Sequence, residues 1–363
     1  MNGGAVRWVN VTQRTANVIG LGLIGTSIAL ALSERGWHVS GSDTDLARLE
    51  GARARHAIEA AGLAPDADVT FVAVPVLAVP DAVKQALVET TGVVTDVGGV
   101  KGPLASAIDD ARFVGGHPMA GSELEGPDGA DAAMFSGAVW VLTPVASTAD
   151  TTFSTVARVI ADMGAEVVAL DPQRHDEVVA VISHVPHLTA ATLMGLAAER
   201  SEEHAALLRL AAGGFRDMTR IASGHPDIWL DVCAENREAI LVGLDSLIEA
   251  LSVVRGVVDA GDRQGLFERL EHARHARHNL PSSVTHPETL AEVRIPIPDR
   301  PGAAAEIFTL AAELGVNIPG FEVVHMAEGH LGVAVVLVDA RYSERYRGGL
   351  IARGFRPSIQ PLA

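Results

Sequence analysis

The stretch Gly20-Leu21-Gly22-Leu23-Ile24-Gly25 follows a short apolar run, residues 16–21, and leads into a segment with helical spacing, residues 24–35. In a turn between a strand and a helix, the first glycine permits the tight bend and the second lets the backbone approach a pyrophosphate. The third lets the helix pack on the strand. The N–H groups at the start of the helix then face the phosphates. The stretch therefore predicts a Rossmann-like α/β domain that binds a dinucleotide.

Asp43 indicates which dinucleotide is bound. It ends the expected second strand, residues 37–42, at the distance from Gly20 where the acidic residue of this motif occurs. A carboxylate at this place accepts hydrogen bonds from the adenosine ribose and repels a 2′-phosphate, so it favours NAD over NADP. The alternatives are a flavin or another nucleotide, or a glycine-rich turn without a ligand. The predicted cofactor site comprises Gly20, Gly22, Leu23, Ile24, Gly25, Asp43, Val74, Pro75 and Asp96.

Composition excludes several other classes of partner. The 363 residues carry 28 Lys and Arg against 45 Asp and Glu, a formal net charge of −17. Such a chain repels polyanions, so neither nucleic acid nor an anionic membrane is an expected partner. Cys233 is the single cysteine, which excludes an internal disulfide and fits the reducing cytoplasm that we expect. The apolar run 18–32 is too short for a membrane span and is interpreted as a buried strand and helix.

The spacing of apolar residues divides the chain into three domains. After a polar tail, residues 1–15, short apolar runs alternate with helical segments through residues 16–172, which predicts a mostly parallel sheet covered on both faces. Residues 173–285 have long segments with helical spacing and predict an all-helical domain for dimerisation and substrate binding. Residues 290–363 follow a β-α-β-β-α-β order, which is typical of a ferredoxin-like fold.

Two details of the helical domain are predicted as well. Residues 228–260 are expected to form one long helix. Pro186 is expected to end or kink the helix over residues 177–198, because proline lacks the N–H that a helix interior needs.

Three clusters of polar residues lie where a ligand is expected to bind. The first, residues 96–102, and the second, residues 116–123, follow the fourth and fifth expected strands. Doubly wound folds bind their ligands at the carboxyl ends of the strands. The third cluster belongs to the helical domain and comprises residues 183–187, 214–220 and 226–229.

These clusters also carry a family resemblance. The glycine turn is followed in order by His117-Pro118-Met119-Ala120-Gly121-Ser122-Glu123, Ser183-His184-Val185-Pro186-His187, and Phe215-Arg216-Asp217-Met218-Thr219-Arg220 with Pro226 and Trp229. Over residues 16–285 the chain thereby resembles the prephenate/arogenate dehydrogenase family of tyrosine biosynthesis. The C-terminal domain, with Asp299-Arg300-Pro301-Gly302 after its first strand, resembles an ACT regulatory domain.

The resemblance implies a reaction and its partners. The reaction is the NAD-dependent oxidative decarboxylation of prephenate to 4-hydroxyphenylpyruvate. Arogenate, which would yield tyrosine directly, remains an alternative because the two substrates differ only in a side-chain keto or amino group. The resemblance also implies a homodimer and feedback inhibition by an aromatic amino acid, tyrosine, bound to the ACT domain.

Residue roles follow from the same resemblance. His117 is expected to be the catalytic group, since a neutral imidazole near pH 7 can take the proton of the substrate hydroxyl. Arg220 is expected to bind a substrate carboxylate with its planar guanidinium. If this stretch is helical, Arg216, with Asp217 beside it, lies one turn earlier on the same face. The remaining substrate-binding residues implied are His187, Glu123 and Trp229.

Gly99 departs from the family pattern. Family members commonly have a serine in this loop, which hydrogen-bonds the substrate hydroxyl, and its loss is expected to slow hydride transfer by ~10²-fold. The departure leaves open a low-activity regulator that responds to NAD and an amino acid.

Two other readings are disfavoured by the residues. A β-hydroxyacid dehydrogenase uses a lysine base that has no counterpart in residues 177–198. No metal is expected either, because Pro186 disturbs the helical spacing of His184 and His187 and no third ligand stands at metal spacing. His272, His275 and His278 are interpreted as a solvated helix face.

Overall fold

The computed structural model of the chain describes residues 13–122, 124–201, 211–278, 290–298, 302–325 and 331–361. The chain divides into two compact units. The first comprises Met1–Ala205 and Met218–Arg255, and the second comprises Ala206–Asp217 and Gly256–Ala363. The N-terminal sheet and most of the helices that follow it belong to the first unit, whereas a C-terminal sheet belongs to the second.

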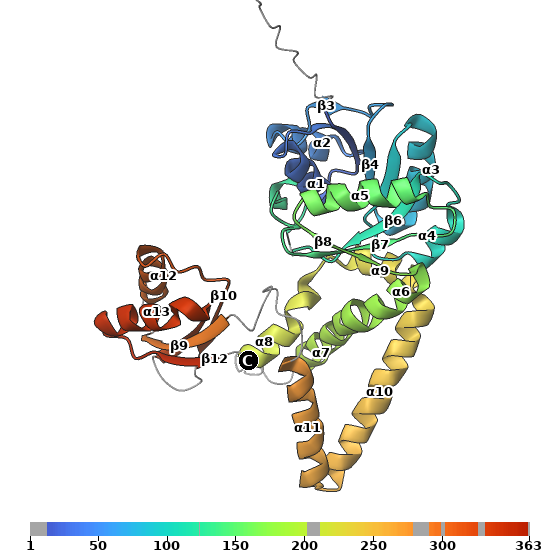
Figure 1. The fold of residues 1–363 in the computed structure, drawn as a ribbon. Coiled ribbons are helices and arrows are strands. Elements are labelled where there is room, and N and C mark those ends of the chain that lie inside the picture. The colour runs from blue at the N-terminus through green and yellow to red at the C-terminus, as the bar shows by residue number, and fades with distance from the viewer. Residues whose placement is uncertain are drawn as a thin grey trace, which may run out of the picture. The chain divides into compact units, whose positions relative to one another are not determined.

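The first unit is built on one sheet, drawn in blue to green in Figure 1. Its strand order is β3-β2-β1-β4-β5-β6-β7-β8. Neighbouring strands are parallel except β6 and β7, which are antiparallel. This mostly parallel sheet confirms the predicted Rossmann-like domain. The strands are β1 (Thr15–Ile19), β2 (His38–Ser42), β3 (Ala60–Ala61), β4 (Val69–Val72), β5 (Val93–Asp96), β6 (Phe113–Pro118), β7 (Val139–Thr143) and β8 (Glu166–Ala169).

Helices cover both faces of this sheet, as the sequence predicts. One core contains Phe71 of β4 together with residues of α1 (Leu23–Ser33) and α5 (Asp150–Asp162). The other contains the next residue, Val72, together with residues of α3 and α4. Successive strand residues point to opposite faces, so a strand buried on both faces is apolar throughout. The remaining helices are α2 (Leu46–Ala54), η1 (Val76–Ala78), α3 (Val79–Glu89), α4 (Gly102–Ala107) and η2 (Pro127–Gly129).

The helical region begins with α6 (Pro172–Val179), continues through a π-helical segment, η3 (Ala180–His184), and proceeds into α7 (Val185–Ser201). Asp171 starts α6, because its side chain accepts hydrogen bonds from the N–H groups of Gln173 and Arg174 at 2.9 and 3.1 Å. Pro186 lies in the first turn of α7, directly after the π-helical segment η3, which interrupts the regular hydrogen bonding of the helix. Regular α-helical geometry thus ends at Val179 and resumes at Val185.

The prediction of one helix over residues 228–260 is wrong. The chain forms α9 (Pro226–Glu235) and α10 (Arg237–Asp259), and the two are separated at Asn236. Asn236 has φ −110° and ψ 32°, outside the α-helical region. Its side chain donates to the carbonyl of Asp176, and this contact explains why the break occurs there. The other helices of this region are α8 (Gly213–Thr219), η5 (Arg220–Ser223) and α11 (Arg263–His278).

The C-terminal sheet belongs to the second unit and is antiparallel throughout, with the order β10-β11-β9-β12. The elements occur in the expected β-α-β-β-α-β order. Tyr346 anchors the core between sheet and helices, and its hydroxyl donates to the carbonyl of Ile307 at 3.0 Å. The elements are β9 (Leu290–Pro298), α12 (Ala303–Glu313), β10 (Gly320–His325), β11 (Leu331–Asp339), α13 (Ala340–Ala352) and β12 (Ser358–Pro361).

One helix, Pro172–Glu199, is long and apolar enough to cross a membrane by length and composition alone. A core helix of a soluble protein passes the same test. This helix buries the polar side chains of His175, Asp176 and His184, which hydrogen-bond to other parts of the first unit.

Candidate active site

The glycine turn between β1 and α1 has the geometry expected of a nucleotide site. Gly20 has a φ of +90°, and a Cβ there would lie 2.4 Å from the carbonyl oxygen of Ala73. A Cβ on Gly25 would lie 1.8 Å from the carbonyl oxygen of Gly20. A Cβ on Gly22, in contrast, would meet no atom within 4 Å. The outer two glycines are therefore required by the fold, whereas Gly22 leaves open space at the start of α1.

The other predicted cofactor residues lie around this turn. Asp43 accepts a hydrogen bond from the N–H of Leu21 at 2.6 Å through Oδ2, which ties the carboxylate to the glycine turn. Leu23 and Ile24 form the first turn of α1, and the side chain of Val74 lies next to Gly20. The structure thus brings together at this turn the predicted residues Gly20, Gly22, Leu23, Ile24, Gly25, Asp43 and Val74. Pro75 is the exposed residue that precedes η1.

Asp96 ends β5 and is fully buried in an ion pair with Lys101. Its Oδ1 accepts from the N–H of Gly116 at 3.1 Å, and its Oδ2 accepts from the N–H of Gly98 at 2.8 Å. The Lys101 Nζ also donates to the carbonyl of Gly116 at 2.8 Å. Burial lowers the pKa of Lys101, and the charges of Asp96 and Asp176 oppose that shift. Asp96 and Lys101 thus hold both backbone groups of Gly116, the residue before His117.

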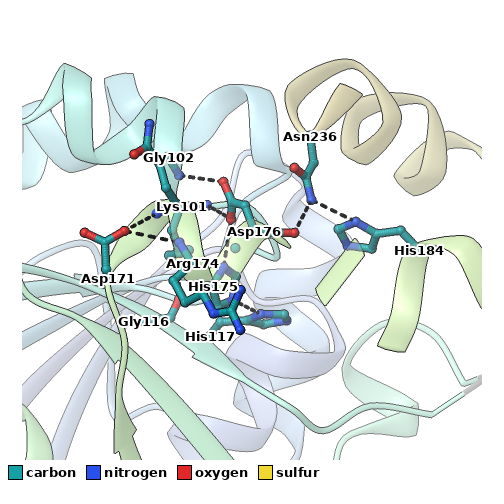
Figure 2. Close-up of polar contacts among 12 residues, drawn as sticks. Lys101, Gly102, Gly116, His117, Asp171, Arg174, His175, Asp176, His184 and Asn236 are labelled. Atoms are coloured by element: carbon teal, nitrogen blue, oxygen red, sulfur yellow. Dashed lines mark hydrogen bonds and ion pairs between the residues drawn. The ribbon is translucent and has the colours of Figure 1, made fainter. Parts of the chain in front are cut away.

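His117 lies on β6 at the same edge of the sheet, and its imidazole forms a hydrogen-bonded chain with two residues of α6 (Figure 2). Its Nδ1 is 2.8 Å from Nε2 of His175, and Nδ1 of His175 is 2.8 Å from Oδ1 of Asp176. We call His117, His175 and Asp176 the histidine relay. Within the described residues, Nε2 of His117 has no hydrogen-bond partner. A Cβ on Gly99 would lie 3.7 Å from this nitrogen.

The surroundings of His117 favour its neutral form. Its pKa lies well below the usual value, chiefly because burial removes the ring from water. His175, Lys101 and His184 lower the pKa further, since each would repel a proton on His117 when charged. At neutral pH the ring is therefore uncharged and can accept a proton.

A second group of aromatic and polar side chains lies between α7 and α9. The rings of His187 and Trp229 are stacked, with centroids 3.5 Å apart, and His184 meets Trp229 edge-on at 6.0 Å. The amide of Asn236 links Nδ1 of His184 to the backbone of Asp176. Burial lowers the pKa of His184 to about 4 and also lowers that of His187. Two of the predicted substrate residues, His187 and Trp229, are thus in direct contact.

The two predicted arginines do not share one α-helix. Arg216 belongs to α8, which ends at Thr219, and Arg220 begins the 3₁₀ turn η5. The helix expected over both residues thus changes from α to 3₁₀ geometry after Thr219, and η5 follows α8 directly. η5 packs against α7, the helix that carries His187. Glu123 lies outside the described residues.

The sequence prediction assigned no role to the central residues of this site, His175 and Asp176. His175 and Asp176 occupy buried positions of α6 together with Pro172 and Val179. Polar residues at the buried positions of an amphipathic helix are a recognisable signal, because burial without a partner is costly. Asn236 gave no comparable signal. Within the described residues, no group of three or more His, Cys, Asp or Glu is placed to hold a metal ion.

Comparison with known proteins identifies the family. Residues 28–169 match the family described as "Prephenate dehydrogenase, nucleotide-binding domain", and residues 171–272 match "Prephenate dehydrogenase, dimerization domain". The prephenate dehydrogenase of Bacillus subtilis (strain 168) is 31% identical, over 90% of this chain and 92% of the relative. The chain belongs to the prephenate dehydrogenase family. As a member, it is an NAD-dependent oxidoreductase.

Solved structures of the family share this fold. Prephenate dehydrogenase from Aquifex aeolicus, in complex with hydroxyphenyl propionate and NAD+, is 27% identical with a TM-score of 0.69. The match covers 74% of this chain and 99% of that one. Arogenate dehydrogenase from Synechocystis is 28% identical with a TM-score of 0.62, over 72% and 98% of the two chains. Family members therefore include enzymes named for either substrate.

Substitutions in the glycine turn test the NAD site of this prephenate dehydrogenase family member. Gly22→Ala is expected to leave Tm unchanged without NAD, because its Cβ meets no atom, but to raise the Kd for NAD about tenfold or more. Gly25→Ala is expected to lower Tm as well, since its Cβ would collide with Gly20. Thermal unfolding and calorimetric titration with NAD measure both effects.

Gly348→Ala in α13 is the matched control, because a Cβ there also meets no atom within 4 Å. Its NAD affinity is expected to equal that of the unmodified chain. An unchanged NAD affinity in Gly22→Ala would show that the pyrophosphate binds elsewhere.

Proposed function

We propose that this chain catalyses the NAD-dependent oxidative decarboxylation of prephenate to 4-hydroxyphenylpyruvate, with arogenate as the alternative substrate. The observation that carries the proposal is the position of His117 at the carboxyl-terminal edge of the sheet, with a lowered pKa and, among the described residues, no hydrogen-bond partner at Nε2. This edge is where doubly wound folds hold their ligands. The cofactor turn lies in the same unit as His117.

The reaction needs a base and a fixed substrate. NAD, when bound, supplies the acceptor for the hydride that leaves the carbinol carbon. His117 takes the hydroxyl proton at Nε2 as that carbon becomes a carbonyl. The ring carboxylate then leaves as carbon dioxide, and the electrons of the broken C–C bond complete the aromatic ring. The carbonyl oxygen thereby becomes a phenolate, to which His117 returns the proton that it took. His117 thus acts on the single proton that must move during oxidation.

Substrate binding is proposed for residues of the helical region. Arg220 anchors a carboxylate, since a guanidinium suits bidentate binding of that group and a chain of net charge −17 needs a local cation for an anionic substrate. The stacked His187 and Trp229 form an apolar wall for the cyclohexadiene ring. The family resemblance supports the inclusion of Glu123 and Arg216, with Asp217, as residues at the entrance.

The domain division and the assembly are proposed along with the activity. Residues 16–172 form the NAD-binding domain, residues 173–285 the helical domain and residues 290–363 the ACT domain. We propose a homodimer through the helical domain, which matches a dimerisation family. Its exposed apolar side chains include Ile228, Leu230, Val242, Ile248 and Leu251, a pattern typical of interaction surfaces. The expected cytoplasmic location stays a prediction.

A catalytically weak regulator is the second candidate function, and Gly99 is the observation that favours it. No side chain at this position can donate a hydrogen bond beside Nε2 of His117. Turnover of prephenate or arogenate distinguishes the two candidates.

Purified chain with NAD and prephenate is expected to form NADH, followed by its absorbance, and arogenate in parallel identifies the preferred substrate. His117→Asn is expected to lower kcat by about 10²–10⁴-fold, the scale of a positioned base, with the Kd for NAD unchanged. Because the pKa of His117 is lowered, kcat should persist below pH 6.5 and fall only at lower pH, as the base becomes protonated. A near-normal rate in His117→Asn would remove this assignment, and no turnover with either substrate would favour the regulator.

The Gly99 position has its own test. Gly99 does not have a positive φ, and a Cβ there makes only ordinary contact with His117. Gly99→Ser would place a hydroxyl beside Nε2, and kcat is expected to rise by up to about 10²-fold. Gly99→Ala, which adds the same Cβ without a donor, serves as the control and should show no rise. Equal kcat values for the serine and alanine variants would mean that the missing hydroxyl does not limit the rate.

The ACT domain is proposed to bind tyrosine and to inhibit the enzyme. Support comes from the β-α-β-β-α-β order and from Gly302, which has a φ of +87° where the loop enters α12. The other loop residues, Asp299, Arg300 and Pro301, lie outside the described residues.

Tyrosine at 100 times its Kd is expected to stabilise the chain by about 2.7 kcal/mol, which raises Tm, and to lower the rate of NADH formation. Alanine at the same concentration is the control and should change neither quantity. Tyrosine that leaves both Tm and rate unchanged would refute this part of the proposal.

A further inference from the structure

We infer that His175 and Asp176 are positioning residues that fix Nε2 of His117 as its unprotonated nitrogen and stabilise the positive charge that His117 acquires. The inference rests on the proposed function insofar as His117 is the base. It assigns roles to two residues of α6 that do not touch the reacting atoms themselves.

The assignment starts at Asp176. Its Oδ1 accepts from the N–H of Lys101 at 2.8 Å, and its Oδ2 accepts from the N–H of Gly102 at 2.7 Å (Figure 2). Both carboxylate oxygens therefore act as acceptors toward the backbone, and an ionised carboxylate can only accept hydrogen bonds. The 2.8 Å contact between Asp176 and Nδ1 of His175 therefore requires a proton on that nitrogen.

The proton on Nδ1 determines the rest of the relay. A neutral His175 then has a lone pair on Nε2, which can only accept. Nδ1 of His117, 2.8 Å away, must be the donor, and so its proton resides on Nδ1. A neutral His117 has one ring proton, so its Nε2 is unprotonated and can act as an acceptor. This is the nitrogen that faces the Gly99 loop.

Burial favours this placement of the protons over the reverse one, in which Nε2 of His175 would donate to Nδ1 of His117. The side chain of His175 is fully buried, and a doubly protonated ring there would lose the hydration that stabilises its charge. The reverse arrangement needs that doubly protonated ring, since His175 would have to donate from both nitrogens. Asp176 already has two backbone donors, so it does not require a charged partner.

The charged groups around His117 leave Asp176 as its stabilising partner. Lys101 and His184 would repel a proton on His117, and the charge of Lys101 is already paired with Asp96. Among the described residues, Asp176 is the carboxylate that hydrogen bonds connect to His117. When Nε2 takes the substrate proton, the new charge is stabilised through His175 by this carboxylate, which remains ionised.

The substitution His175→Asn is designed to keep the contact with Asp176 and to remove the contact with His117. The shorter amide can still donate to Asp176 but cannot reach His117. We expect kcat to fall by about 10²-fold, with KM and the Kd for NAD within about threefold of the unmodified values. His175→Gln can present its amide oxygen to Nδ1 of His117 and should recover part of the lost kcat. His38→Asn, which removes an exposed histidine paired with Glu59, is the matched control and should leave kcat unchanged.

¹⁵N NMR of histidine-labelled protein reads the tautomer directly and needs no substrate. The His117→Asn spectrum identifies the signals of that ring. We expect the unmodified chain to show His117 protonated at Nδ1 and bare at Nε2, and His175→Asn to populate the tautomer protonated at Nε2. A ring protonated at Nε2 in the unmodified chain, or a kcat in His175→Asn within threefold of normal, would overturn the inference. Failure of the proposed function gives a different result from these two outcomes: the unmodified chain would then show no turnover, whichever tautomer His117 has.

Discussion

The geometry of the site depends on one carboxylate. Asp176 comes from the helical region, yet it accepts the N–H groups of Lys101 and Gly102 at the start of α4. Through His175 it also reaches the ring on β6, and through its own carbonyl it receives the amide of Asn236. The loop that carries Gly99, the sheet edge and the junction between α9 and α10 are therefore all connected to a single residue, Asp176. A buried carboxylate of this kind is tolerated because it accepts hydrogen bonds from the N–H groups of Lys101 and Gly102 and contacts Nδ1 of His175.

The backbone beside His117 is held by a second set of buried charges. Asp96 accepts from the N–H of Gly116, and Lys101 donates to its carbonyl. A side chain at Gly116 would lie 2.6 Å from the carbonyl oxygen of Asp96, so only glycine allows this close approach. The ring of His117 is thus restrained twice, at its backbone by the ion pair and at Nδ1 by His175. Because the ring is already held in place, the site needs little reorganisation when His117 accepts a proton. Such preorganisation is a main source of rate enhancement in active sites.

The parts of the molecule that follow from local pattern could be predicted from the sequence. The glycine turn implies a strand, a bend and a helix within a few residues, and Gly20 and Gly25 occupy positions that no other residue fits. Of the site, His117 could be selected from the sequence because it begins the motif over residues 117–123 that carries the family resemblance. The link from His117 to His175 joins residues far apart in the chain and depends on how α6 lies against the sheet edge. The break at Asn236 likewise arises from a contact with Asp176, which local spacing does not reveal.

Gly99 and the histidine relay can be understood together. A hydroxyl in the loop would hold the substrate and the base from the side of Nε2, but Gly99 offers only backbone there. Orientation of the imidazole must then come from its other nitrogen, and the 2.8 Å contact with His175 provides it from a side that solvent does not reach. This contact also determines which nitrogen of His117 is unprotonated. One hydrogen bond therefore fixes both the orientation of the imidazole and its ability to accept a proton at Nε2. A chain without the loop hydroxyl therefore relies on Asp176 for the alignment of its base.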